Sequence, residues 1–153
     1  MHSDEFYLQR AVALAASNVA GGGRPFAALL VKDDQVIVEA VNTLHISQDP
    51  IAHAELLAIR AASQQLGPRL EGCVIYASGQ PCPMCLSAMH LCGVTRVVYA
   101  ASNQQGEPFG LSTAAIYQQL ALPLSEQKLA IQHIPQPAMV EIYSDWKACH
   151  EPG

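Results

Sequence analysis

Short apolar runs alternate with longer amphipathic segments along the whole of this 153-residue chain. The turn at Asp33–Asp34–Gln35 makes the first two apolar runs an antiparallel hairpin. Later strands are separated by helices and therefore need parallel crossovers, which predicts a mixed sheet with helices on both faces. The expected helices are 3–20, 53–66, 83–92, 111–122 and 139–149, and the five expected strands are 26–31, 36–41, 73–77, 94–100 and 129–134.

Composition narrows the classes of protein that fit. Half of the residues are apolar and 14% are charged, which excludes a disordered chain and suits one compact domain, 1–153. The formal net charge of −5 disfavours broad binding to nucleic acid. No apolar run reaches the roughly 20 residues that a membrane span needs. The acidic start at Met1–Glu5 differs from a secretory signal, so we expect a cytoplasmic protein without a membrane partner.

The chain carries five cysteines, an odd number that fits a disulfide framework poorly. A chain of this size has no need of disulfides to hold its core together. We therefore expect a reducing compartment and a metal or catalytic use for some of them, which are Cys73, Cys82, Cys85, Cys92 and Cys149.

Two motifs concentrate the chemistry, and each opens a predicted helix just after a loop. The first is His53–Ala54–Glu55 and the second is Pro81–Cys85, which contains Cys-x-x-Cys. Two residues between thiolates let both sulfurs reach one ion, and a catalytic zinc site uses three protein ligands and leaves its fourth position open. His53, Cys82 and Cys85 supply such a set.

Glu55 lies two residues after His53, and residues at that spacing do not share a face of a regular helix. Both side chains can point to one site only in the first turn of the helix. The sequence places them there, so we expect Glu55 beside the metal without being a ligand. The two helix N-termini would also favour thiolates through their partial positive charge.

Other readings of these residues remain open. Cys-x-x-Cys alone is also found in redox pairs, and a closed structural zinc would need a fourth ligand such as Cys73 or Cys92. Both of these cysteines lie in apolar segments, which is typical of inert buried thiols. His90 lies on the helix that carries Cys85, where a pocket role and a surface role are equally open.

The two motifs together resemble the zinc nucleobase-deaminase signature, H-x-E followed by P-C-x-x-C. The chain is similar to the cytidine-deaminase-like superfamily over nearly its whole length, and within it to bacterial guanine deaminases and then to tRNA adenosine deaminases. The resemblance implies a three-layer α/β/α sandwich with one CMP/dCMP-type deaminase domain. The matching stretches are 22–26, Asn42, 49–55, 81–85 and 97–101.

By this resemblance the chain is a zinc-dependent hydrolytic deaminase that releases ammonia from a small amino-substituted nucleobase or nucleoside. His53, Cys82 and Cys85 would hold Zn²⁺, and Glu55 would move protons between water, substrate and leaving ammonia. Substrate contacts would come from the side chains of Asn42 and Phe26 and from the backbone N–H of Ala54. The family also tends to form homodimers.

Three departures from the family pattern bear on the substrate. Gln80 stands where many relatives have Glu, and His90–Leu91 replaces an aromatic pair of the guanine deaminases. The segment 109–117 carries Ser112 and Thr113 where guanine deaminases have an acid. Guanine, another base and a nucleoside all remain open, and the alternative is a tRNA-specific adenosine deaminase. With 8 Lys and Arg against 13 acids and no basic cluster, the sequence favours the small molecule.

Overall fold

The computed structural model describes residues 1–150 and contains a four-stranded sheet in the order β2-β1-β3-β4. The strands are β1 (Ala27–Lys32), β2 (Gln35–Val41), β3 (Cys73–Gly79) and β4 (Arg96–Ala101). β1 runs antiparallel to both β2 and β3, whereas β3 and β4 are parallel. β2 and β3 therefore point the same way, as the crossover between them requires. The predicted mixed sheet with a hairpin at one end is confirmed.

The hairpin turn follows from the residues at its tip. Asp33 and Asp34 both have positive φ values, 50° and 61°. Consecutive left-handed residues are typical of the two-residue turn whose twist matches that of the flanking strands, and aspartate tolerates this conformation better than most residues. β2 thus lies at one edge of the sheet, with β1 beside it.

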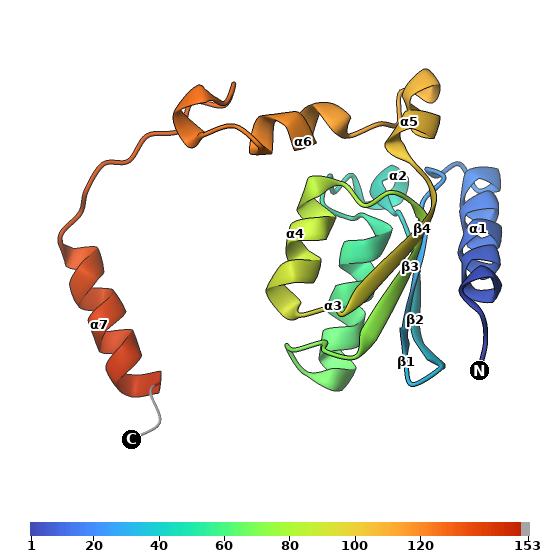
Figure 1. Ribbon diagram of the computed structural model, residues 1–153, viewed down its shortest axis with the longest axis horizontal. Helices are drawn as coiled ribbons and strands as arrows, with labels where there is room; N and C mark the ends of the chain where they lie inside the picture. The colour runs from blue at the N-terminus through green and yellow to red at the C-terminus, as the bar shows by residue number, and fades with distance from the viewer. Residues whose placement is uncertain (151–153) are drawn as a thin grey trace. The chain divides into compact units, whose positions relative to one another are not determined.

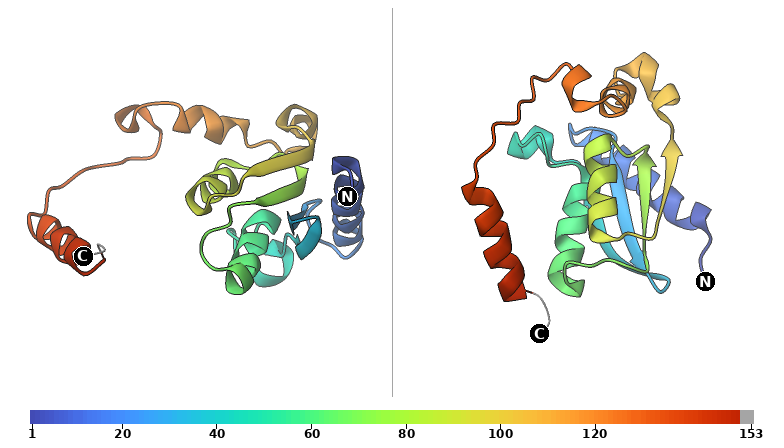
Figure 2. Two further views of the ribbon diagram at one scale, coloured as in Figure 1. Left: turned by 60° about the horizontal axis from the view of Figure 1, so that its bottom comes forward. Right: turned by 60° about the vertical axis from the view of Figure 1, so that its left-hand side comes forward.

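Helices cover both faces of the sheet, which confirms the three-layer sandwich (Figures 1 and 2). On one face, α1 (Asp4–Ala20) buries Tyr7, Ala11 and Ala15, which are spaced four residues apart and so share one side of the helix. On the other face lie α3 (Ala54–Leu66) and α4 (Pro83–Cys92). Neighbouring residues of the central strands alternate between the two cores: Leu29 packs with the α1 side and Leu30 with the α3 and α4 side.

Shorter elements complete the first of two compact units, Met1–Gln118 and Gln119 onward. They are α2 (Leu44–Ser47), α5 (Asn103–Gly106), the 3₁₀ turn η1 (Glu107–Phe109) and most of α6 (Ala114–Leu120). The second unit contains η2 (Leu124–Glu126) and α7 (Ala138–His150). None of the helices among the described residues is long and apolar enough to cross a bilayer.

The predicted fifth strand, 129–134, is wrong. This segment has irregular backbone and its side chains are exposed. A strand needs a neighbour to receive its hydrogen bonds, and the described part of the second unit contains no other strand. Pro135 and Pro137 also withhold backbone donors directly after the run. Its apolar residues, Leu129 to Ile131 and Ile134, were therefore a misleading signal.

Candidate metal centre and active site

The two motifs meet where β3 ends, as ligand sites commonly do at the carboxyl ends of parallel strands. The Gln80 N–H donates to the Ala101 carbonyl at 2.7 Å, which extends the pairing of β3 with β4 by one bond. The chain then turns into α4, whose N-cap is Cys82 and whose first residue is Pro83. Proline suits this position because it has no N–H to leave unpaired.

His53 occupies the matching place on α3. It is the N-cap, with extended backbone angles of φ −75° and ψ 147°, and Glu55 follows in the first turn. Residues two apart in a regular helix point to different faces, but His53 lies just outside the helix, so this rule does not apply to His53 and Glu55. The expected convergence at the helix start is confirmed.

Three potential ligand atoms form a nearly equilateral triangle. Cys82 Sγ lies 3.5 Å from His53 Nδ1, Cys85 Sγ lies 3.6 Å from His53 Nδ1, and the two sulfurs are 3.6 Å apart. A tetrahedral zinc with Zn–S of about 2.3 Å and Zn–N of about 2.0–2.1 Å would separate its sulfurs by about 3.8 Å and sulfur from nitrogen by about 3.5 Å. The donor set therefore fits zinc in both chemistry and size. Cys73 and Cys92 are not part of this group.

Electrostatics at the triangle favours a thiolate. Hydrogen bonds from Cys85 and then from His53 lower the pKa of Cys82 to about 4. The pKa of His53 is raised, chiefly by its hydrogen bond with Cys82, while burial and the charge of Arg24 act in the opposite direction. A deprotonated sulfur is the form that ligates a metal.

Glu55 is almost completely enclosed, with 6% of its surface exposed. Burial raises the pKa of its carboxyl group to about 7. A carboxyl group with a pKa near neutrality can both accept and return a proton at physiological pH. The burial of Glu55 and the raised pKa of its carboxyl group suit acid–base chemistry.

A small hollow of about 70 Å³ opens beside this centre. Five predicted residues line it, from four different parts of the chain: Phe26, Asn42, His53, Glu55 and Cys82. Asn42 is 2% exposed, and its Oδ1 accepts a hydrogen bond from the Leu44 N–H at 3.0 Å. The structure thus brings the predicted substrate side chains to the predicted metal centre.

Ala54, the remaining predicted contact, is fully buried as the first residue of α3. Its N–H belongs to the first turn, where the backbone donors have no partner within the helix. His90, which the sequence left undecided, does not line this hollow and instead borders a shallow depression between α4 and β4.

Arg24, Gln80, Leu111 and Thr113 also line the hollow, and sequence reasoning assigned none of them a binding role. Hydrogen bonds order this wall: Gln80 Oε1 accepts from the Asn103 N–H at 2.8 Å, and Asn103 Oδ1 accepts from the Thr113 N–H at 3.2 Å. Arg24 lies two residues before the predicted contact Phe26, and this proximity is the sequence signal that could have indicated a position at the site. The family resemblance had singled out segment 109–117, which contains Thr113, as bearing on the substrate, whereas the local sequence pattern gave no sign that this segment returns to the site.

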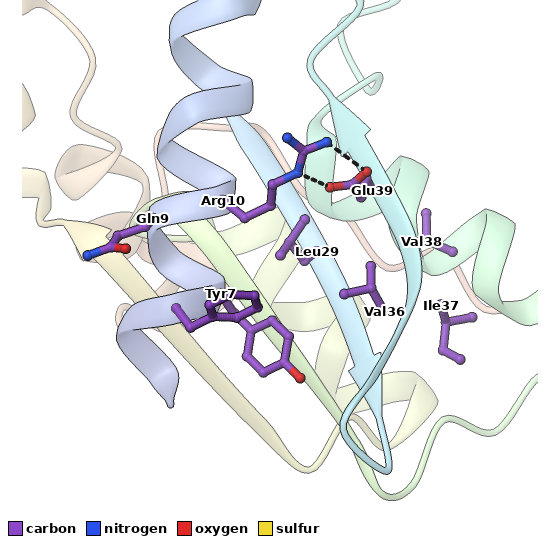
Figure 3. A pocket seen from close by; sticks show the side chains of 9 residues that line it. Tyr7, Gln9, Arg10, Leu29, Val36, Ile37, Val38 and Glu39 are labelled. Atoms are coloured by element: carbon purple, nitrogen blue, oxygen red, sulfur yellow. Dashed lines mark hydrogen bonds and ion pairs between the residues drawn. The ribbon is translucent and has the colours of Figure 1, made fainter. Parts of the chain in front are cut away.

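A much larger hollow lies elsewhere, between α1 and β2 (Figure 3). Leu29 and Val36 give it an apolar floor, and Arg10 and Glu39 form an ion pair at its side. It contains none of the predicted site residues and no metal-ligand set. Size alone therefore does not identify the site of chemistry in this protein.

Comparison with known families supports the chemistry read from the geometry. Residues 1–101 match the family described as the cytidine and deoxycytidylate deaminase zinc-binding region. Guanine deaminase of Bacillus subtilis is 37% identical over 145 residues, which is 94% of this chain and 93% of that protein. A tRNA-specific adenosine deaminase of the same organism is 39% identical over 107 residues, 69% of this chain and 66% of its own length.

Among these solved structures too, the guanine deaminase of Bacillus subtilis is more similar to this chain than the tRNA deaminase is. The crystal structure of the Bacillus subtilis guanine deaminase superposes with a TM-score of 0.91 at 34% identity, covering 99% of this chain and 98% of that one. A guanine deaminase from Nitrosomonas europaea gives a TM-score of 0.69 at 28% identity, covering 74% and 66%. A tRNA:A34 deaminase gives 0.64 at 30% identity, covering 76% and 85%.

Proposed function

Since the chain belongs to the cytidine and deoxycytidylate deaminase zinc-binding family and is a zinc-dependent hydrolytic deaminase, we propose that its substrate is guanine or a closely related amino-substituted base. The observation that carries this proposal is the hollow that Asn42, Phe26 and Glu55 share beside the His–Cys–Cys triangle. The small volume suits a single base, and the extent of similarity to guanine deaminase covers nearly the whole chain. For the same reason we treat 1–153 as one deaminase domain.

We propose that His53, Cys82 and Cys85 hold the zinc. When bound, zinc lowers the pKa of coordinated water to near neutrality and so supplies a nucleophile. Glu55 accepts a proton as water adds to the amino-bearing ring carbon and delivers it to the adjacent ring nitrogen. It then accepts the second proton, from the new hydroxyl group, and passes it to the amino group, which leaves as ammonia while the carbonyl forms. Its burial keeps the carboxylate and the transferred proton away from bulk water.

The remaining residues position the ring. Because Asn42 Oδ1 is occupied by the Leu44 N–H, its amide presents Nδ2 as a donor to a ring oxygen. Phe26 offers an aromatic surface against which a planar base can pack. The Ala54 N–H is a second donor close to Glu55.

A small molecule rather than a nucleic acid is the proposed partner. A tRNA enzyme needs cationic side chains along its substrate groove. Within the lining of the hollow, Arg24 is the one residue of fixed positive charge, and the chain as a whole is acidic. The Bacillus tRNA-specific adenosine deaminase is also similar over a shorter part of this chain than the guanine deaminase is.

We further propose a homodimer and a cytoplasmic location. Leu91 on α4 is 80% exposed, a large apolar side chain that a second copy would cover. All five cysteines are free in the structure, and thiol ligands persist best in a reducing compartment. Sedimentation analysis of the wild type and Leu91→Glu tests the dimer: we expect the variant to shift toward monomer.

The decisive experiment compares wild type with Glu55→Gln in zinc content, melting temperature and ammonia release from guanine. We expect the variant to fold and to keep zinc, because glutamine fills nearly the same volume. Its kcat should fall at least 10³-fold, roughly the middle of the range for general acid–base catalysis, with a smaller change in KM. A zinc-loaded variant that retains more than about a tenth of the wild-type kcat would refute the role of Glu55.

A further inference from the structure

Arg24 is a cation at the catalytic hollow without a carboxylate partner. Three other arginines, Arg10, Arg69 and Arg96, each form an ion pair with an acidic side chain. Among residues 1–150, the guanidinium group of Arg24 has no such partner and no hydrogen-bond acceptor, although it lines the hollow. A guanidinium group is a donor only, so an oxygen or nitrogen acceptor has to come from solvent or from a ligand.

The backbone of Arg24 is held firmly at this place. Its carbonyl accepts a hydrogen bond from Asn18 Nδ2 at 2.8 Å and another from the Phe26 N–H at 2.8 Å. The preceding residue, Gly23, is packed so closely that a Cβ there would lie 2.5 Å from the ring of His45. The base of the Arg24 side chain is therefore fixed beside the site by packing on both sides of the loop.

The neighbouring polar group points to the same ligand chemistry. The oxygen of the Asn42 amide is taken by a backbone N–H, so the amide nitrogen is its free end. Glu55 supplies the one carboxylate of the lining, and the proposed function uses this group for proton transfer. The part of the substrate that lies away from Glu55 thus meets donors from Arg24 and Asn42, and a carbonyl oxygen with two lone pairs can accept from both.

We propose that Arg24 is a specificity-determining residue that binds the ring carbonyl oxygen of an oxo-substituted amino heterocycle. This inference rests on the proposed deaminase function and narrows its substrate class. The site selects rings in which one ring nitrogen separates the carbon of the oxo group from the carbon that carries the leaving amino group, as in guanine and cytosine. It discriminates against rings in which a second amino group replaces that oxygen. An amino group is a hydrogen-bond donor, and it would then face the donors of Arg24 and Asn42.

Two matched pairs of compounds test the inference on zinc-loaded protein. Guanine and 2,6-diaminopurine differ by one oxygen exchanged for an amino group, and so do cytosine and 2,4-diaminopyrimidine. We would measure kcat/KM by ammonia release, and Kd by calorimetry in the Glu55→Gln background, where turnover is blocked. The variant is Arg24→Met, which keeps the length of the side chain, and the control is Arg60→Met, since Arg60 is exposed on α3 and does not line the hollow.

We expect wild type to prefer the oxo member of a pair by at least tenfold in Kd. Arg24→Met should lose about tenfold in affinity for the oxo compound, the lower end of the range for a charged hydrogen bond because Arg24 is exposed, and should bind the diamino compound as before. Arg60→Met should behave as wild type. A preference that survives Arg24→Met, or that both variants lose equally, would overturn the assignment.

The two proposals fail in different ways. If guanine releases no ammonia but the cytosine pair shows the preference that depends on Arg24, guanine is wrong as the substrate and the role of Arg24 stands. If guanine is turned over and Arg24→Met leaves both ratios unchanged, the role of Arg24 is wrong and the function stands. Absence of binding of both oxo compounds to zinc-loaded protein would overturn both.

Discussion

Asn18 on α1 ties together two loops that line the catalytic hollow, and its removal should loosen both. Its Nδ2 donates to the Arg24 carbonyl at 2.8 Å and to the Asn42 carbonyl at 3.0 Å. The Arg24 carbonyl keeps a second donor, Phe26 N–H, when Asn18 is lost. Among the described residues the Asn42 carbonyl has no other donor, and Asn42 is almost fully buried.

These contacts set the expected magnitude for Asn18→Ala. Two neutral hydrogen bonds are worth about 0.5–1.5 kcal/mol each, and the orphaned Asn42 carbonyl favours the upper half of that range. Alanine returns up to about 0.7 kcal/mol through its better helix propensity. The free energy of unfolding should therefore fall by about 1–2 kcal/mol, which corresponds to a decrease in Tm of about 2–8 °C.

The functional effect should be on binding more than on chemistry. Asn18 touches neither the metal ligands nor Glu55, so KM should rise several-fold while kcat changes little. Ser17→Ala is the matched control, because Ser17 lies one residue earlier on the same helix with an exposed side chain. Urea unfolding and steady-state ammonia release on Asn18→Ala and Ser17→Ala make the comparison. An Asn18→Ala protein with wild-type stability and wild-type KM would refute the idea that this amide holds the two loops.

Three further predictions concern the metal, the pH dependence of stability and one glycine. Cys82→Ala should purify with little zinc, measured by elemental analysis, and full occupancy would contradict the ligand assignment. Hydrogen bonds from Arg96 and Tyr76 lower the pKa of Asp4 to about 2, so its ionised form stabilises the fold above the ordinary carboxyl pKa and this contribution is lost as the pH falls toward 2. Asp4→Asn should accordingly lower Tm at pH 7 and reduce the further decrease in Tm as the pH falls. If Tm plotted against pH gave parallel curves for the variant and the wild type, this would count against a stabilising interaction of Asp4 with Arg96 and Tyr76. Gly93 has a φ of +80°, and a Cβ there would lie 2.5 Å from Arg69 Nη2. Gly93→Ala should lower the free energy of unfolding, measured in urea, by about 1–2 kcal/mol. Gly110→Ala is the control: Gly110 has a φ of +73° and open space around it, so this variant measures the cost of the backbone conformation without a steric clash.

Local patterns predicted most of the elements in the first unit. The proline after Cys82 and the glycine at 93 fixed both ends of α4, and the predicted helix 83–92 coincides with the observed one. The extended backbone of His53 is a helix-start feature, and this is why the sequence could predict that the side chains of His53 and Glu55 face the same hollow. Such sequence signals depend only on neighbouring residues, and they predict the structure correctly where each residue's own conformational preference agrees with the fold.

Long-range features were harder to foresee. The return of Leu111 and Thr113 to the hollow depends on the Gln80–Asn103 and Asn103–Thr113 hydrogen bonds, which join residues 23 and 10 positions apart and leave no periodic pattern. The short helices α2 and α5 were missed because four residues are too few to show a helical period. The segment 129–134 showed the opposite failure, a strand-like pattern without a neighbouring strand.

The ligand positions of α3 and α4 have a consequence for how the cell would control the amount of this protein. The N-caps of α1 and α5 are Ser3 and Ser102, and the hydroxyl group of each accepts a hydrogen bond from a backbone N–H of its helix. The N-caps of α3 and α4, His53 and Cys82, form no such side-chain hydrogen bond. The first turns of the two helices beside the substrate are then secured through the ion that their N-caps share. Ligand binding to the native state alone raises its population by mass action. Zinc supply would therefore govern how long each molecule escapes proteolysis, as well as whether it is active.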